Sequence, residues 1–150
     1  MPRPTLDPAT LQVGEALPRY ERQFTEVDLM AYGAATWDWH RLHYDHRYAQ
    51  SKGLPAPVID GQVYGAMFAR VATDWAGPGA FLSRLQLQMK SMAFAGDCLR
   101  ISGEVTELNA AESAGWIVRV AQRLHAGERL IAQASTELRW GGAAAVGQLR

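Results

Sequence analysis

The segment 37–46 holds the densest group of side chains in the sequence that can do chemistry: it contains three of the 4 histidines and two aspartates. Asp38 and His43 are five residues apart, in a stretch that we do not expect to be regular helix. A bend there can aim both side chains at one water molecule. One group can then take a proton from that water while the other returns a proton, as reversible hydration of a double bond requires. The alternative, on spacing alone, is a capping loop whose histidines make structural hydrogen bonds.

The same segment raises a second alternative, a metal site, because His40, His43 and His46 recur at three-residue intervals. On a helix, each step of three residues turns the side chain by about 300°, so three of them cannot converge on one ion. An irregular loop can gather them, but none of the familiar zinc spacings is present. We therefore expect no resident metal.

Gly61 is the third candidate, because it stands at the start of the long apolar segment 61–75. Free backbone N–H groups at the start of a helix can stabilise an oxyanion that forms on a thioester carbonyl. The alternative is a glycine that is needed only for a tight passage from loop into helix.

Two short helices and a loop must position these groups. Thr25, followed by acidic residues, predicts the N-terminus of a first helix. The helical spacing predicts that its buried stripe is formed by Val27, Met30, Ala31 and Ala34. Asp45 can cap a second helix, and Gly53 suits its left-handed exit. The Leu-Pro-Ala-Pro sequence at 54–57 cannot continue a helix and predicts a loop.

The segment 61–75 is apolar nearly all round, which predicts a buried helix that Gly77-Pro78-Gly79 ends. After it, the period of the apolar residues changes to two, which predicts four half-buried strands with turns near Gly96, 109–115 and 126–127. One buried helix followed by four such strands predicts an α+β fold, with an antiparallel sheet wrapped around that helix. The inward-facing residues are expected to be Leu85, Leu87, Met89, Leu99, Ile101, Val105, Trp116, Val118, Val120, Leu124, Leu130, Ala132, Ala134, Leu138 and Trp140.

The composition of the 150 residues is 48% hydrophobic and 20% charged, with a net charge of +0. It predicts one globular domain over residues 1–140 and a flexible tail over residues 141–150. The scattered charges give no reason to expect nucleic acid or a membrane as partner. Cys98 is the only cysteine and is expected to be a packed, inert thiol. With no apolar leader in the sequence, a cytoplasmic location is the simplest prediction.

Several segments together resemble the MaoC-like hydratases and dehydratases: Asp38-Trp-His-Arg-Leu-His43, Tyr48-Ala49, Pro57-Val-Ile-Asp-Gly61 and Met92-Ala-Phe-Ala-Gly96-Asp97. The pattern of that family is Asp-x-Asn-Pro-hydrophobic-His, then a Pro-x-x-His-Gly step into the long helix, then a Gly-Asp turn between strands. The resemblance implies a single hot-dog domain, in which a curved sheet wraps the long helix, and a dimer whose interface shapes an acyl tunnel. It also implies that Asp38 and His43 are the catalytic dyad and that Gly61 is the oxyanion donor.

This sequence departs from the family pattern at two places. His40-Arg41 stand where the family has Asn-Pro, and Asp60 stands where it has histidine. We expect all three residues to take part in oxyanion or substrate binding, with Asp60 either altering the oxyanion site or anchoring His40 or Arg41. Residues 40–45 are similar to fungal-type mitochondrial dehydratases and mesaconyl-thioester hydratases, whereas residues 73–78 are similar to hydratases of steroid side-chain thioesters. The identity of the acyl group therefore stays open.

The resemblance implies a lyase that adds water reversibly to a trans-2-enoyl thioester of coenzyme A or acyl carrier protein, giving the 3-hydroxyacyl thioester without a cofactor. Two alternatives stay open: a hot-dog acyl-CoA thioesterase, and a non-catalytic acyl-binding subunit of a heteromeric hydratase. A small curved sheet leaves edge strands exposed, and long exposed edges are usually paired or covered. We therefore expect a homodimer, or a heteromer with a related hot-dog chain.

Overall fold

The computed structural model describes residues 6–111 and 115–141. Within these residues, no helix is both long enough and apolar enough to span a membrane. The helices and strands, with two short 3-10 turns labelled η, are η1 Pro8–Thr10, β1 Tyr20–Gln23, α1 Glu26–Thr36, η2 Arg41–His43, α2 His46–Ser51, α3 Gly61–Ala76, β2 Ala80–Met89, β3 Cys98–Ala111, β4 Gly115–Ala126 and β5 Arg129–Trp140.

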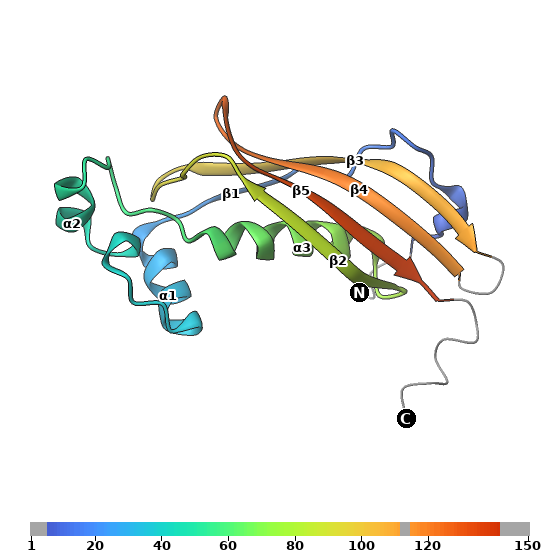
Figure 1. Ribbon diagram of the computed structural model, residues 1–150, viewed down its shortest axis with the longest axis horizontal. Coiled ribbons are helices and arrows are strands. Elements are labelled where there is room, and N and C mark those ends of the chain that lie inside the picture. Colours follow the sequence, from blue (N-terminus) through green and yellow to red (C-terminus); the bar gives the residue numbers. More distant parts are fainter. Residues whose placement is uncertain (1–5, 112–114, 142–150) are drawn as a thin grey trace.

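The described strands form one antiparallel sheet in the order β1-β3-β4-β5-β2, which curves over α3 (Figure 1). The short helices α1 and α2 project beyond one end of the sheet, near the start of α3. This arrangement confirms the predicted α+β hot-dog fold. The sequence predicts four strands after the long helix, and the structure adds a fifth strand, β1, at the edge of the sheet beside β3.

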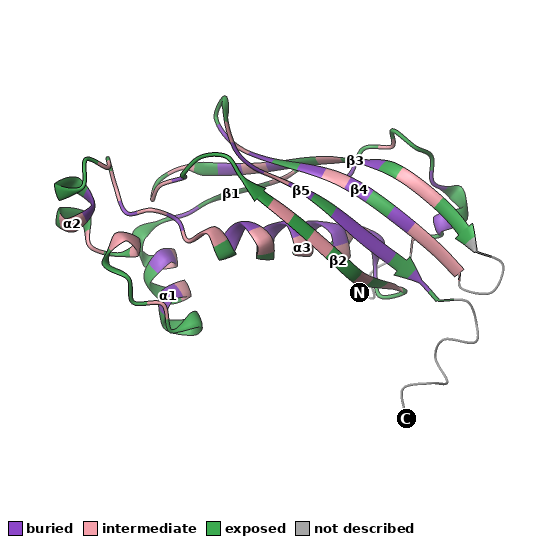
Figure 2. Ribbon diagram, in the orientation of Figure 1, coloured by how far each residue is buried: buried purple, intermediate pink, exposed green. Residues whose placement is uncertain are grey.

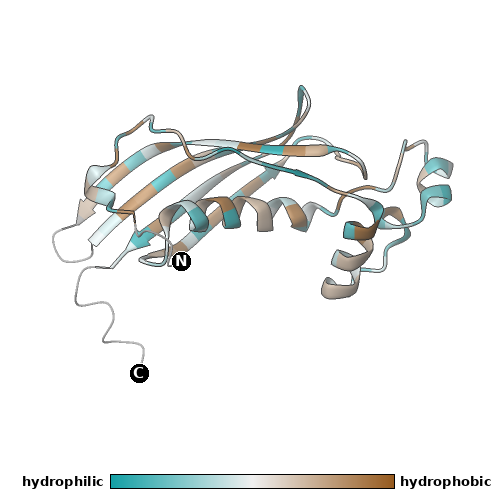
Figure 3. Cartoon of the chain, turned by 180° about the vertical axis from the view of Figure 1, so that it is seen from behind, coloured by the Kyte–Doolittle hydropathy of each residue, from teal (hydrophilic) through white to brown (hydrophobic). Residues whose placement is uncertain are grey.

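The core lies between α3 and the inner face of the sheet, and the strands alternate between hydrophobic and hydrophilic residues (Figures 2 and 3). Most of the predicted inward residues are buried, and eight of them are at most 1% exposed: Leu99, Ile101, Val105, Val118, Val120, Leu124, Ala132 and Leu138. They pack with Tyr64, Phe68, Val71 and Ala72 of α3 in one hydrophobic cluster.

Leu85, Leu87 and Trp116 are partly buried and pack against the core, whereas two other predicted inward residues, Leu130 and Met89, are not part of it. Leu130 is only partly buried, and Ile131 is fully buried beside it. The pairing of β4 with β5 shifts register between Leu124 and His125, and such an irregularity offsets the alternation that a regular strand would keep. Met89, at the end of β2, is 58% exposed.

The predicted start of α1 is confirmed, but the predicted buried face is wrong. Thr25 accepts a hydrogen bond from the Asp28 N–H, and the Asp28 carboxylate accepts one from the Thr25 N–H. The buried residues of α1 are Leu29 and Gly33, whereas the expected stripe faces solvent. Apolar residues occur on more than one face of this helix, so periodicity alone does not select the face that packs.

The elements that follow α1 lie where the sequence predicts them. Asp45 caps α2 by accepting a hydrogen bond from the Tyr48 N–H, and Gly53 has a φ of 77°. Gly77 ends α3. The predicted flexible tail, residues 141–150, lies outside the described residues except for its first residue, and it stays a prediction.

Cys98 is exposed rather than packed, which corrects the expectation for its thiol. The cytoplasmic location also stays a prediction.

Candidate active site

Asp38 is placed by the turn that ends α1. Trp37 adopts the left-handed conformation with a φ of 60°, and its N–H donates to the Gly33 carbonyl. The Asp38 N–H donates to the same carbonyl at 3.0 Å. A β-carbon on Gly33 would lie 2.8 Å from the Asp38 carbonyl oxygen, so only glycine allows this close approach. The sequence reading did not select Gly33, although a glycine inside a helix is a signal of such packing.

His43 is oriented by the loop before α3. Its Nδ1 lies 2.7 Å from the Val58 carbonyl oxygen. A carbonyl can only accept, so Nδ1 carries the hydrogen and, in the neutral ring, Nε2 carries the free lone pair. The Val58 N–H in turn donates to the Leu42 carbonyl at 2.8 Å. The segment before α2 and the loop before α3 are therefore joined by two hydrogen bonds at this point.

Asp60 is the N-cap of α3, and its Oδ1 accepts a hydrogen bond from the Gln62 N–H at 2.8 Å. Its other oxygen, Oδ2, is buried and has no hydrogen-bond partner. The buried Tyr64 hydroxyl holds the same loop, because it donates to the Ile59 carbonyl at 3.3 Å and accepts from the Ala93 N–H at 3.1 Å.

These elements bring Asp38, His43 and Asp60 together: their oxygen and nitrogen atoms lie within 4.8 Å of one another. They line a cavity of about 10 Å³. That is about the space of one water molecule, which needs two to four polar partners, roughly what these three groups offer. The rest of the cavity wall is formed by Phe24, Asp28, Leu29, Tyr32, Gly33 and Val63.

Two ionisable groups of α1 in this wall have shifted pKa values. Burial, together with the Asp60 carboxylate, raises the pKa of Tyr32, so its phenol stays neutral. Hydrogen bonds from the side chain and backbone of Thr25, and the pairing with Arg22, lower the pKa of Asp28 to about 2. Asp28 is therefore anionic at neutral pH, and Arg22, at 2.8 Å, offsets its charge.

His40 and Arg41 lie outside the cavity wall. Arg41 pairs with Asp45 at 2.7 Å, and its guanidinium stacks on the Tyr48 ring. The expectation that Asp60 anchors His40 or Arg41 is therefore wrong, because Arg41 finds a carboxylate closer in sequence. The backbone N–H of His40 instead donates a hydrogen bond to Asp38 Oδ1 at 3.0 Å.

The three histidines do not form a shared site in the described part of the chain. His40 Nδ1 accepts a hydrogen bond from the Leu42 N–H, and His46 Nδ1 contacts Glu26 at 3.0 Å. The metal alternative built on these histidines is thus not formed.

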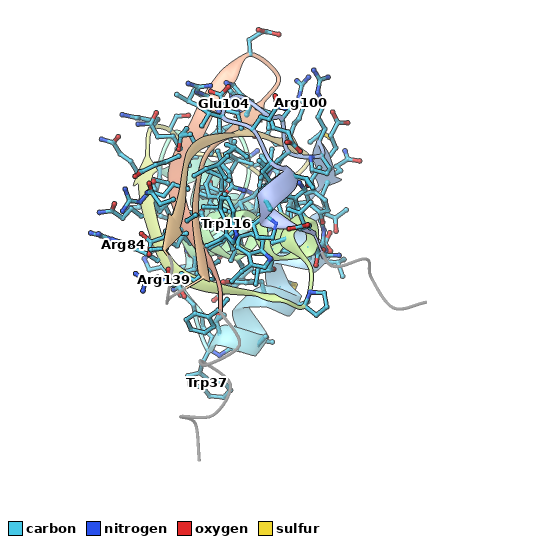
Figure 4. All side chains as sticks on the ribbon, turned by 90° about the vertical axis from the view of Figure 1, so that its right-hand side faces the viewer. Trp37, Arg84, Arg100, Glu104, Trp116 and Arg139 are labelled. Carbon is cyan, nitrogen blue, oxygen red and sulfur yellow. The ribbon has the colours of Figure 1, made fainter. Side chains whose placement is uncertain are left out.

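Gly61 is the first residue of α3, at the positive end of the helix dipole. Within the described residues, its N–H has no hydrogen-bond acceptor. A β-carbon there would lie 2.5 Å from the Met89 methyl group, so a larger residue would displace that side chain. Trp37 and Trp39, on either side of Asp38, are 80% and 45% exposed, and Figure 4 shows Trp37 projecting away from the sheet.

Known proteins align with this chain over most of its length. The family profile described as MaoC like domain matches residues 10–124. A mitochondrial 3-hydroxyacyl-[acyl-carrier-protein] dehydratase of Arabidopsis thaliana is 32% identical over 87 residues, which are 58% of this chain and 51% of that protein. The chain thus aligns with about half the length of this relative. The 3-oxo-4,17-pregnadiene-20-carboxyl-CoA hydratase beta subunit of Mycobacterium tuberculosis is 29% identical over 97 residues, 65% of this chain and 75% of that protein.

Solved structures share the fold. A chain of the ChsH1-ChsH2 complex from Mycobacterium tuberculosis has a TM-score of 0.77 and 25% identity, covering 86% of this chain and 98% of its own length. The (R)-hydratase from A. caviae has a TM-score of 0.78 and 22% identity, covering 87% of this chain and 98% of its own length. The profile match spans well over half of the chain and includes Asp38, His43 and the start of α3. The chain belongs to the MaoC-like family of hydratases and dehydratases.

Proposed function

We propose that this protein adds water reversibly to a trans-2-enoyl thioester of coenzyme A or acyl carrier protein, giving the 3-hydroxyacyl thioester without a resident cofactor. One observation carries the proposal: Asp38 and His43 converge on a cavity of one-water size beside the start of α3. The names of the relatives support it, since they are hydratases and a dehydratase of acyl thioesters.

The dyad supplies both proton transfers. As the water oxygen bonds to C3 of the enoyl group, one member of the dyad takes a proton from that water, and the other delivers a proton to C2. His43 can accept a proton at Nε2, because its Nδ1–H is held by Val58. Asp38 Oδ1 accepts a hydrogen bond from the His40 backbone N–H, and the other carboxylate oxygen can accept one from the water. Dehydration runs the same transfers in reverse.

The start of α3 stabilises the charge that forms on the thioester oxygen. The Gly61 N–H has no acceptor in the described structure and lies at the positive helix end, so it can donate to an enolate-like oxygen. The Asp60 carboxylate cannot stabilise that oxygen directly, because both carry negative charge. Its Oδ1 instead fixes the first turn of the helix through the Gln62 N–H.

A second protomer is needed to hold the acyl group. A cavity of about 10 Å³ does not accommodate an acyl chain, so the channel must be completed elsewhere. Of the two edge strands in the described sheet, β1 has 4 residues and β2 has 10. Long exposed edges are usually paired. We propose that two copies, or this chain and a related hot-dog chain, pair along β2. Two solved structures from Mycobacterium tuberculosis, the ChsH1-ChsH2 complex and the HadBC (3R-hydroxyacyl-ACP dehydratase) complex, contain chains of similar fold, which supports this assembly.

A panel of enoyl-CoA esters tests the activity. We expect loss of enoyl absorbance without release of free thiol, whereas thiol release would indicate a thioesterase. Asp38→Asn and His43→Gln should each lower turnover by roughly 10²-fold or more. His46→Gln is the matched control, because His46 contacts Glu26 rather than the cavity. Full turnover in both dyad variants contradicts the proposal, and activity only after mixing with a related chain would show a heteromeric enzyme.

A further inference from the structure

Asp38, His43 and Asp60 form a set of possible metal ligands that differs from the three histidines considered above. One oxygen or nitrogen atom of each residue lies within 4.8 Å of the other two, and all three residues line the cavity of about 10 Å³. The atoms that bind Zn²⁺ stand about 2.0–2.2 Å from the ion, so two of them are at most about 4.4 Å apart. A small rotation of either carboxylate is therefore enough to close the three groups on one ion.

Each of these side chains has one polar atom held by the backbone and another left for a ligand. His43 Nδ1 donates to the Val58 carbonyl at 2.7 Å, which leaves the Nε2 lone pair for an ion. Oδ1 of Asp38 and Oδ1 of Asp60 each accept the backbone N–H two residues further along the chain, at 3.0 and 2.8 Å. Histidines and carboxylates that bind metals are usually oriented by hydrogen bonds of this kind.

The charge at the cavity favours a cation. Asp60 Oδ2 is buried and has no hydrogen-bond partner within the described residues. A buried carboxylate oxygen is costly unless an opposite charge or a donor compensates it. The carboxylate of Asp38 adds a second negative charge within 4.8 Å. None of the described residues that line the cavity is a lysine or an arginine.

The ionisable groups around the cavity do not supply the missing positive charge. The His40 ring packs edge-on against the His43 ring, with 6.0 Å between centroids, but its Nδ1 accepts a backbone N–H, so this ring is neutral. Tyr32 is a neutral phenol, because burial raises its pKa. Arg22 is already paired with Asp28, the third carboxylate of the wall. The charge of Asp38 and Asp60 is therefore left for an ion to balance.

We propose that Asp38, His43 and Asp60 bind one divalent transition-metal ion, such as Zn²⁺, and that this ion inhibits the enzyme. An imidazole nitrogen beside carboxylate oxygens suits Zn²⁺ better than Mg²⁺ or Ca²⁺, which prefer oxygen ligands alone. The bound ion takes the Nε2 lone pair and the Asp38 oxygen that the dyad needs, and it occupies the space of the attacking water. The inhibition rests on the proposed function, whereas the binding of the ion does not.

Calorimetric titration of the chelator-treated protein with ZnCl₂ tests the binding without substrate. We expect one ion per chain, which EDTA removes. Asp60→Asn should weaken the binding by about tenfold or more, because loss of even a hydrogen-bond partner of a metal ligand costs about 10–100-fold in affinity. Asparagine caps helices about as well as aspartate, so the start of α3 is retained. His46→Gln is the matched control and should leave the binding unchanged, because it disrupts an exposed histidine–carboxylate pair, with Glu26, outside the cavity wall.

Turnover of an enoyl-CoA ester gives the second readout. Zn²⁺ should inhibit the unaltered protein over the concentration range in which calorimetry shows binding, and EDTA should restore the activity. MgCl₂ at the same concentrations should not inhibit. Half-inhibition of the turnover that Asp60→Asn retains should need about tenfold more Zn²⁺ or above, matching the loss of affinity.

Zn²⁺ binding that is unchanged in Asp60→Asn, or that His46→Gln abolishes, indicates an adventitious ion only and overturns the inference. Activation by Zn²⁺ overturns the inhibitory role. If Asp60→Asn does not fold, Asp38→Asn and His43→Gln each remove another ligand and take its place in the titration. Failure of the proposed function is distinguishable, because a chain inactive on every enoyl thioester still gives the calorimetric result.

Discussion

The body formed by α3 and the sheet and the projecting segment 26–60 are built in different ways. The body is held by long antiparallel ladders and a continuous hydrophobic core. The projecting segment is held by helix caps and a few hydrogen bonds, and it leaves Val27 and Met30 76% and 52% exposed. Active sites are commonly carried by the less stable regions of a fold. Here the segment supplies Asp38 and His43, and the segment lies beside the N-terminus of α3, which belongs to the body (Figure 1).

If this separation is real, changes in the projecting segment should alter activity more than stability, and changes in the body should do the reverse. Gly33 contacts Asp38 within the projecting segment, and the Tyr64 hydroxyl of the body contacts the loop before α3, so changes at these two residues test the separation.

Gly33→Ala should have the largest effect. Its β-carbon would collide with the Asp38 carbonyl oxygen, so Asp38 must move. A displacement of about 1 Å in a catalytic group can cost on the order of 10²-fold in rate. We expect that loss in turnover, with the unfolding midpoint of the sheet little changed. Gly65→Ala is the control, because its β-carbon would meet only Leu87 and Leu85 at 3.9 and 4.0 Å. Equal effects in both variants would contradict the argument.

Tyr64→Phe should lower both stability and activity, because the Tyr64 hydroxyl joins the body to the loop that carries Asp60. Removing it leaves the buried Ala93 N–H without an acceptor, which costs about 1–3 kcal/mol of unfolding free energy. Turnover should fall as well, since the Ile59 carbonyl loses its donor. Denaturant unfolding and turnover measure the two effects. Tyr48→Phe, whose ring stacks with Arg41, is the control and should change neither by a comparable amount.

Glu137→Gln probes the outer face of the body. Hydrogen bonds from Ser83 first, then from Arg139 and Arg119, lower the pKa of Glu137 from 4.5 to about 2. A folded-state pKa below the unfolded one gives stability that is present above about pH 4.5 and is lost as the pH falls toward 2. The variant should be less stable by about 1 kcal/mol at pH 7, because both arginines are partly solvated.

Urea unfolding of both proteins between pH 7 and pH 3 measures this difference. It should shrink on acidification, while turnover at pH 7 is unchanged. The exposed Glu128→Gln is the control and should give no such trend. A difference that grows as the pH falls would refute the stated role of Glu137.

Met30→Ala should have the smallest effect. It tests whether the face of α1 that contains Met30 is exposed, as the structure shows, rather than buried. Because Met30 is 52% exposed, the change in unfolding free energy should stay within about 0.5 kcal/mol. Leu29→Ala, on the packed face of the same helix, should cost about 2 kcal/mol or more. Thermal unfolding of the two variants decides between the faces, and a larger loss for Met30 would restore the face expected from the sequence.

The body could be predicted from sequence because its signals are local and repeated. Alternation of period two fixes which strand residues face the core, and a nearly all-apolar segment of helical length must be buried. The burial of Ile131 was not predicted, because a register shift between paired strands cannot be seen in the alternation of apolar and polar residues along the sequence. In α1, two apolar faces compete, and Leu29 is buried because it belongs to the hydrophobic cluster that also contains Phe24 and Val63.

The candidate site could be predicted in part. Asp38 and His43 were selected for their chemistry and spacing, and the structure places them at one cavity. The partners of Asp60 were not predictable, because they depend on how the loop before α3 folds back on the segment after α1. The same holds for Gly33 and for the Tyr64 hydroxyl, whose contacts join residues far apart in the chain.

The size of the cavity has a consequence for the geometry of the product. An enoyl thioester is planar around its double bond, so water can arrive from either face. A space of about 10 Å³ lined by Asp38, His43 and Asp60, the N-cap of α3, has room for a single water at one place beside the start of that helix. Once the thioester oxygen is bound at Gly61, only one face of the alkene meets that water. The protein should therefore form one enantiomer of the 3-hydroxyacyl product, and chiral chromatography of the product would show it.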